Sequence, residues 1–241
     1  MPKLVIEPSF WELFPACEIG VLALRGINNT EEGNSAARQD IVNLLEQANL
    51  EAKRFLTQPV LSQCPVVAVW RDAFSRFKKE KDARSSIEAL LRRIEKGKAV
   101  GPINPLVDVY NAISLRYGLP CGVVDLDALV GDLRLTVTAG GDDFLALGDE
   151  HSEHTLPGEV CYVDDAGAVC RCWNWRDGQR TMLTEKTTNA LAIFENLDPA
   201  RHAALLEAMH ALQAWAGKTV GGSISLKTVL TRESPEVALG Q

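Results

Sequence analysis

The sequence has no uninterrupted apolar stretch that approaches the roughly 20 residues needed for a membrane-spanning helix. Its start, MPKLVIEPSFWELF, lacks the basic residues, apolar run and small-residue cleavage site of a secretory signal, so we expect a cytoplasmic protein. A G-x-S-x-G nucleophile elbow and the glycine spacing of phosphate-binding loops are also missing. The pairs Gly140-Gly141 and Gly221-Gly222 are more typical of turns. These absences argue against a membrane protein and leave no motif for a serine hydrolase or a nucleotide-binding loop.

Basic charge is in short supply, because 25 Lys and Arg face 32 Asp and Glu, for a formal net charge of −7. A protein that binds nucleic acid over a broad surface would favour the opposite sign. Residues 71–98 differ, with ten Lys and Arg against five Asp and Glu. This segment is either a solvated helical face or a contact for an anionic partner. The candidates for such a contact are Lys78, Lys79, Arg92 and Arg93.

The six cysteines, at positions 17, 64, 121, 161, 170 and 172, are scattered through a chain long enough to bury a core without disulfides, which favours free thiols. His151 and His154 precede three of these cysteines, but the spacing matches no known zinc finger. We therefore expect neither a metal site nor another cofactor.

Hydrophobic periodicity indicates helices first and strands later. Two buried strands, KLVIE and IGVLALRGI, are followed by helical patterns over about 35–56, 66–79 and 84–96. The helix that begins at Pro105 has Asn104 as N-cap and ends before Gly118 and Pro120. Strands separated by Gly and Asp turns then extend to about residue 195, and a last amphipathic helix covers 199–216. This order predicts a mixed α+β or α/β fold.

The stretch CRCWNWRD, residues 170–177, combines two tryptophans with Asn174, Arg171 and Arg176. A buried indole N–H needs a partner, so the stretch is either the wall of a ligand pocket or a buried hairpin. Two more polar groups stand near strand ends: Arg134 in GDLRL and Glu195 in AIFEN. An acid at the end of an apolar strand must be exposed, paired or functional.

Residues 103–197 resemble the B3/B4 domain, the editing domain of the bacterial phenylalanyl-tRNA synthetase β subunit, and are most similar to its free-standing versions. The resemblance is carried by INPLVDVYNAISLRYGLPCGVVDLD, GDLRLTVTAGGDDFLALGDE, PGEVCYVDDAGAVCRCWNWRD and TEKTTNALAIFENL. It implies a three-layer, PheT/TilS-like fold in which helices flank a central mixed sheet. It also implies three parts: an N-terminal α/β part over 1–100, a strand-rich pocket core over 101–220 and a C-terminal tail over 221–241.

The resemblance also assigns site residues. Asn111 matches a pocket Asn on the Asn-Pro helix, preceded here by Tyr110 where the synthetase has Thr, and Asp108 shares the helix face of Asn111. Gly122 stands where the synthetase has a pocket His, so a His-assisted water cannot be carried over. Trp173, Asn174 and Trp175 replace a glycine-rich loop, and Glu195 is the nearest match to a glutamate that recognises the tyrosine hydroxyl. Arg134, Arg171 and Arg176 are candidates for approaching the substrate or the terminal phosphates of an RNA.

The resulting expectation is an aminoacyl-tRNA hydrolase. Asn111 and backbone N–H groups near Gly122 would orient the ester of a mischarged tRNA, and Asn174 and Glu195 would bind the amino acid. A binding module that senses an amino acid or tRNA without catalysis is the alternative, favoured by the missing His and the acidic surface. A metal-dependent small-molecule hydrolase is a third possibility. The sequence does not indicate an oligomeric state.

Overall fold

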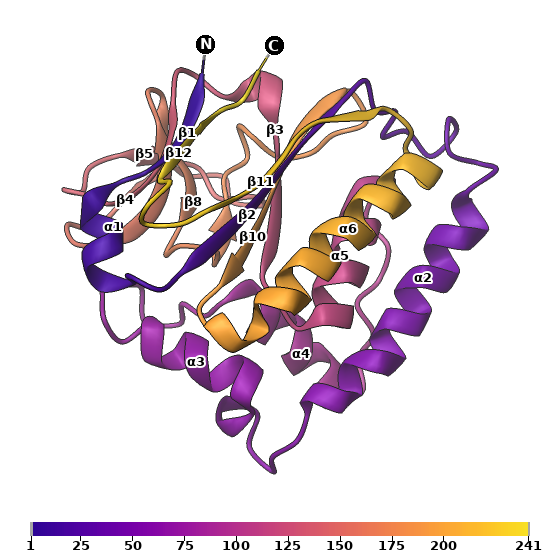
Figure 1. Ribbon diagram of the computed structural model, residues 1–241, viewed down its shortest axis with the longest axis horizontal. Coiled ribbons are helices and arrows are strands. Elements are labelled where there is room, and N and C mark those ends of the chain that lie inside the picture. The colour runs from indigo at the N-terminus through magenta and orange to yellow at the C-terminus, as the bar shows by residue number, and fades with distance from the viewer. Residues whose placement is uncertain (1, 241) are drawn as a thin grey trace.

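The computed structural model describes residues 2–240 and has the mixed α+β class that the sequence predicts (Figure 1). Its strands form two main sheets. The six-stranded sheet has the order β12 (Glu236–Ala238), β1 (Lys3–Ile6), β4 (Leu133–Val137), β7 (Val160–Asp164), β8 (Gly167–Arg171) and β9 (Arg176–Asp177). The four-stranded sheet has the order β11 (Ser223–Leu230), β2 (Glu18–Arg25), β10 (Asn189–Asn196) and β3 (Cys121–Asp125).

Helices cover one face of the four-stranded sheet, and the six-stranded sheet faces its other side. In Figure 1, α6 (His202–Thr219) lies in front of α5 (Pro105–Tyr117), and α2 (Arg38–Glu51) lies to their right. The helices α3 (Pro65–Ala73) and α4 (Ser86–Glu95) lie at the bottom of this view, and α1 (Pro8–Leu13) follows β1. A short pair, β5 (Asp143–Phe144) and β6 (Glu153–His154), completes the strands of residues 2–240.

The burial of β2 and β10 explains why these strands form the middle layer. Six consecutive residues of β2 are buried, and so are seven of β10, so both faces of each strand are covered. A strand with one wet face would alternate between apolar and polar residues instead. Their continuous apolar runs, IGVLAL and ALAIF, are therefore the sequence signature of this layer.

The helix α5 has the ends that the sequence predicts. The Asn104 Oδ1 accepts a hydrogen bond from the backbone N–H of Val107 at 3.0 Å, Pro105 occupies the first turn, and Gly118 ends the helix at φ 60°. That left-handed conformation is strained for any residue with a Cβ atom. The turn after Gly118 leads directly into β3, which places this strand beside α5.

The strand pairing crosses the boundaries expected near residues 100 and 220. β1 pairs in parallel with β4, and β2 pairs with β10. The segment expected as a tail over 221–241 contains β11 and β12, which pair with β2 and β1. Backbone hydrogen bonding therefore makes β11 and β12 part of the two sheets rather than a tail.

A candidate ligand pocket between the two sheets

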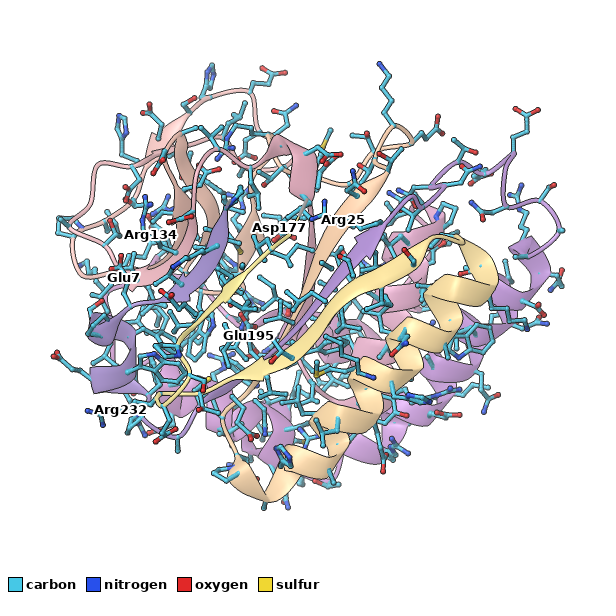
Figure 2. The ribbon with its side chains drawn as sticks, turned by 45° about the horizontal axis from the view of Figure 1, so that its top comes forward. Glu7, Arg25, Arg134, Asp177, Glu195 and Arg232 are labelled. Atoms are coloured by element: carbon cyan, nitrogen blue, oxygen red, sulfur yellow. The ribbon has the colours of Figure 1, made fainter. Side chains whose placement is uncertain are left out.

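A cavity that opens to solvent lies between the two sheets; the space without atoms in and at the mouth of it, open solvent included, is about 530 Å³, and we call it the central cavity. The six-stranded sheet contributes Tyr162, Cys170 and Asp177, which are direct partners across β7, β8 and β9 and therefore share one face. The four-stranded sheet contributes Gly122 and its partner Ile193, followed two residues later by Glu195. Figure 2 shows Glu195 in the middle of the molecule, with Asp177 labelled above it. The side chains of one sheet thus form one wall of the cavity, and those of the other sheet form the opposite wall.

Glu195 is the most deeply buried charged group of the cavity, with 2% of its surface exposed. The Tyr162 hydroxyl donates to its Oε1 at 2.8 Å, and the Asn174 Nδ2 donates to its Oε2 at 2.7 Å. Burial raises the pKa of Glu195 from 4.5 to about 7, although both hydrogen bonds oppose the rise. No cation lies within ion-pair distance of it among residues 2–240, so the carboxyl group is poised between its two protonation states near neutral pH.

Asn174 is held in place by a turn with unusual backbone geometry. Cys172 and Trp173 have φ angles of 45° and 67°, in the left-handed region that non-glycine residues seldom adopt. The Trp173 N–H donates to the Val160 carbonyl oxygen at 2.6 Å, and the Cys172 N–H donates to the Glu159 Oε1 at 2.8 Å. These bonds hold the turn so that the amide of Asn174 reaches Glu195.

The anchor of this turn is a buried ion pair. Arg171 is 1% exposed, and its guanidinium donates to the fully buried Glu159 at 2.9 and 3.1 Å. Glu80 and Glu153 accept from the same guanidinium at 3.1 and 2.9 Å. Although burial opposes it, hydrogen bonds from Arg171 and two backbone N–H groups hold the pKa of Glu159 below its ordinary value. Arg171 is thereby surrounded by three carboxylates.

Two polar side-chain atoms of the cavity lack partners. Four buried polar side-chain atoms of residues 2–240 make no hydrogen bond, and two of them, Ser86 Oγ and Trp173 Nε1, belong to residues that line this cavity. The Trp173 N–H is turned toward Glu195 and opposes the rise of its pKa, but does not reach hydrogen-bond geometry. Buried polar groups are nearly always paired, so unpaired ones in a cavity mark a place that a ligand can satisfy.

Five of the residues singled out in the sequence line the central cavity: Gly122, Trp173, Asn174, Trp175 and Glu195. Trp173 also belongs to the core, because its ring packs against those of Phe10, Phe14 and Trp70 at centroid distances of 4.7–5.0 Å. The two alternatives considered for the tryptophan stretch therefore both hold in part. Trp173 is buried in an aromatic cluster, and Trp175 is half-buried at the cavity.

Four other predicted residues lie outside the lining of the cavity. Asn111 is buried in α5, and its side chain forms no hydrogen bond with the described part of the chain. Burial and then the charge of the cavity residue Asp177 raise the pKa of its neighbour Tyr110, so Tyr110 lies near the cavity without lining it. Asp108 lines separate cavities beside α2, where burial raises its pKa to about 6. Arg134, in β4 of the six-stranded sheet, pairs with Glu7 and Asp165 (Figure 2).

The structure corrects the expectation that Arg171 contacts RNA. Its guanidinium is buried and already neutralised by acids, so it cannot reach a phosphate without breaking the anchor described above. Arg176 remains partly exposed, paired with Asp149 and stacked over Trp175. Within the basic segment, Arg92 pairs with the buried Glu88 and Arg93 donates to the Ala99 carbonyl oxygen. Lys78 and Lys79 make no ion pair within residues 2–240.

Tyr162, Asp177 and Ser86 are cavity residues that the sequence analysis did not identify. Tyr162 lies in a strand that is buried throughout, so no alternation of polar and apolar residues distinguishes it from core. Asp177 follows a turn, where Asp is common for local reasons. The strand order brings Tyr162 and Asp177 together, and the packing of α4 adds Ser86; only the tertiary structure supplies both.

No group of three or more His, Cys, Asp or Glu within residues 2–240 is arranged to hold a metal ion. In the same described range, none of the helices combines the length and the hydropathy that a bilayer crossing requires.

The comparisons with known proteins agree with this architecture. The family model of the B3/4 domain matches residues 69–212, more than half of the chain, and the chain therefore belongs to this family. The match includes α4, α5 and every strand that lines the central cavity.

Similar proteins include β subunits of phenylalanine–tRNA ligase. That of Ruegeria pomeroyi is 36% identical over 94 residues, 38% of this chain and 12% of the relative. That of Cereibacter sphaeroides is 30% identical over 118 residues, 49% of this chain and 14% of the relative. The chain thus spans only a small part of their length. An N-terminal fragment of the Pyrococcus horikoshii phenylalanyl-tRNA synthetase β subunit shares the fold, with a TM-score of 0.50, 9% identity, and coverage of 94% of this chain and 53% of the fragment.

Gly122 faces open space, which gives a first prediction. A Cβ atom added there would meet no atom within 4 Å, and the backbone is outside the left-handed region. Gly122→Ala is therefore expected to raise the free energy of unfolding by about 0.4–1 kcal/mol, measured by urea denaturation. Gly20→Ala is the control, since its Cβ would meet the Met209 sulfur at 2.6 Å and should destabilise the protein. A destabilising Gly122→Ala would show that the space is filled.

Proposed function

We propose that the chain binds the aminoacylated 3′ end of a tRNA in the central cavity and hydrolyses the ester of a mischarged amino acid. The observation that carries the proposal is that Glu195, which is buried and has no ion-pair partner among the described residues, lines a cavity within the segment that matches the B3/4 family. The chain's similarity to phenylalanine–tRNA ligase β subunits supports a ligand of this kind. The conclusion that the chain acts as a free-standing editing protein is part of the proposal.

The chemistry requires little beyond positioning. An aminoacyl ester is already activated, so orienting a water molecule and stabilising the developing oxyanion can supply most of the rate enhancement. β3 is the edge strand of its sheet, and Gly122 leaves open space beside its backbone. Backbone N–H groups near Gly122 are the proposed donors to the ester oxygen, and Asn111 is proposed to orient the water from α5.

The tRNA would approach from the open side of the cavity. The ribose and phosphates are too large to enter with the amino acid, so they would stay outside, near Arg176 and Trp175. Stacking of the terminal adenine on the half-buried indole of Trp175 would be a sequence-tolerant contact of the kind that single-stranded RNA makes. Lys78 and Lys79 remain the proposed contacts for the acceptor stem, because both basic groups are free of acidic partners in residues 2–240.

A panel of mischarged tRNAs tests the proposal. The wild-type protein is expected to release the amino acid from at least one of them. Asn111→Ala should lower that rate by about 10²-fold if the amide orients the water. The matched control is Asn43→Ala, which removes an exposed amide from α2. Equal rates for the wild type and Asn111→Ala would remove Asn111 from catalysis. If none of the charged tRNAs is hydrolysed, the proposed hydrolase activity is wrong.

A sensor is the second candidate. The cavity has Gly122 where a His is expected, and Asn111 does not line it, so the groups that would assist a water are fewer than those that would bind an amino acid. A free amino acid or uncharged tRNA that raises the thermal midpoint, without turnover of any charged tRNA, would favour this candidate.

A further inference from the structure

The central cavity carries two carboxyl groups and no basic side chain. Glu195 and Asp177 both line it, while Lys, Arg and His are absent from its walls as the structure describes them. The charge of Asp177 raises the pKa of Glu195, so the two groups act on one another inside the same space. Asp177 lines the cavity and is an exposed residue, in contrast to the buried Glu195.

The rest of the protein treats buried acids differently. Glu159 is paired with Arg171, Asp164 with Arg180, and Glu88 with Arg71 and Arg92. Within residues 2–240 only Asp108 and Glu195 are buried acids without an ion pair, and Asp108 accepts the backbone N–H of Ile103 at 2.7 Å. An ionised carboxylate accepts about four hydrogen bonds, so Glu195 has capacity beyond Tyr162 and Asn174. A cation is what its environment lacks.

We infer that the cavity takes an aminoacyl group with a second positive charge at the end of a long aliphatic side chain, of the lysine type. The inference deepens the proposed function and rests on it for the orientation of the ligand. The ester must stay near the open side, since the tRNA cannot enter. The α-ammonium group, one carbon from the ester, would then pair with Asp177, and the side chain would extend toward Glu195.

The walls between the two acids fit an aliphatic chain. Leu133, Val169 and Ile193 line the cavity, and these residues offer only apolar surface to the methylene groups of a side chain. A terminal ammonium group would then reach Glu195 opposite Tyr162 and Asn174. A ligand with two positive charges balances the two carboxylates, whereas a neutral side chain would leave Glu195 either protonated or charged without a partner.

Two amides that differ only in the terminal ammonium group test this inference. Lysinamide and norleucinamide mimic the aminoacyl carbonyl without a carboxylate, and isothermal titration calorimetry at pH 7.5 measures their binding to the full chain. Lysinamide is expected to bind at least about tenfold more tightly. Binding of lysinamide must also ionise Glu195 fully, so it should release more protons than binding of norleucinamide, detected as a difference in how the two binding enthalpies depend on the buffer. Proton uptake by the α-amino group is common to both amides and cancels in that difference.

Two conservative variants separate the roles of the acids. Glu195→Gln should abolish the preference for lysinamide, and Asp177→Asn should weaken both amides by a similar factor while leaving the ratio intact. Equal binding of the two amides, a preference that survives Glu195→Gln, or no measurable binding of either amide would overturn the inference. Hydrolysis is a separate readout. If lysinamide binds preferentially but no charged tRNA is hydrolysed, the cationic ligand is supported and the hydrolase activity is wrong. If only tRNAs charged with neutral amino acids are hydrolysed, the hydrolase activity is supported and the cationic ligand is wrong.

Discussion

Glu159→Ala is expected to lower the free energy of unfolding by about 3–5 kcal/mol, the range found when one partner of a buried ion pair is removed. Glu159 is fully buried and accepts from Arg171 with both carboxylate oxygens. It also accepts from the N–H of Cys172, which stands at the start of the left-handed turn. The substitution would leave the buried Arg171 guanidinium without its buried counter-charge. It would also remove the hydrogen bond that holds the turn from which Asn174 reaches Glu195. Urea denaturation monitored by tryptophan fluorescence measures the loss.

Glu153→Ala is the matched control for this prediction. Glu153 pairs with the same guanidinium at 2.9 Å, but its side chain is 54% exposed. An exposed partner contributes about 0–1 kcal/mol, because water replaces it readily. The loss in the free energy of unfolding is therefore expected to be several-fold smaller for Glu153→Ala than for Glu159→Ala. Similar losses for both variants would show that Arg171 depends no more on the buried Glu159 than on its exposed partner Glu153.

Glu195→Gln is expected to stabilise the protein at high pH. The folded state holds the pKa of Glu195 at about 7, above the ordinary 4.5. Between these values the folded protein binds more protons than the unfolded chain, so this group lowers stability as pH rises from about 4.5 to about 7. Above pH 7 the full effect, about 3 kcal/mol, is present. Glutamine has no charge to lose, and its amide can donate to the Tyr162 hydroxyl while its oxygen accepts from Asn174.

Urea denaturation across pH 4 to 8 checks this prediction. The advantage of Glu195→Gln over the wild type should be near zero at pH 4 and grow to about 3 kcal/mol at pH 8. Glu207→Gln, at an exposed glutamate of α6, is the control. An advantage that does not change with pH would show that the carboxyl group of Glu195 is not ionised in an uncompensated state. Glu195 would then have no uncompensated charge for a cationic ligand to neutralise.

The two predictions describe acids with opposite roles. Glu159 is paired and contributes to folding, because Arg171 offsets its desolvation. Glu195 is unpaired and opposes folding when charged, because Tyr162 and Asn174 donate hydrogen bonds but no charge. A protein tolerates such a group where function needs it, and perturbed carboxyl groups accordingly cluster at functional sites.

Much of the fold follows from local patterns in the sequence. The signals that end α5, an Asn-Pro start and a Gly-x-Pro stop, act through backbone geometry within a few residues, and the structure has the helix between them. The continuous apolar runs of β2 and β10 predict strands covered on both faces. In β11 the alternation of Ser223, Ser225 and Lys227 with Ile224 and Leu226 is typical of a half-buried strand, but its pairing with β2 joins residues about 200 positions apart and depends on the tertiary structure.

The sequence by itself determined the family resemblance, the mixed α+β class and the candidates Gly122, Trp173, Asn174 and Glu195, because residue identity and spacing carry that information locally. Only the tertiary structure decided which charges meet. It placed Arg171 in the core beside Glu159, left Glu195 without a cation, and set Tyr162 and Asp177 around the same cavity. Such pairings depend on the order of strands far apart in the chain, and the composition of each segment is the same whichever order they take.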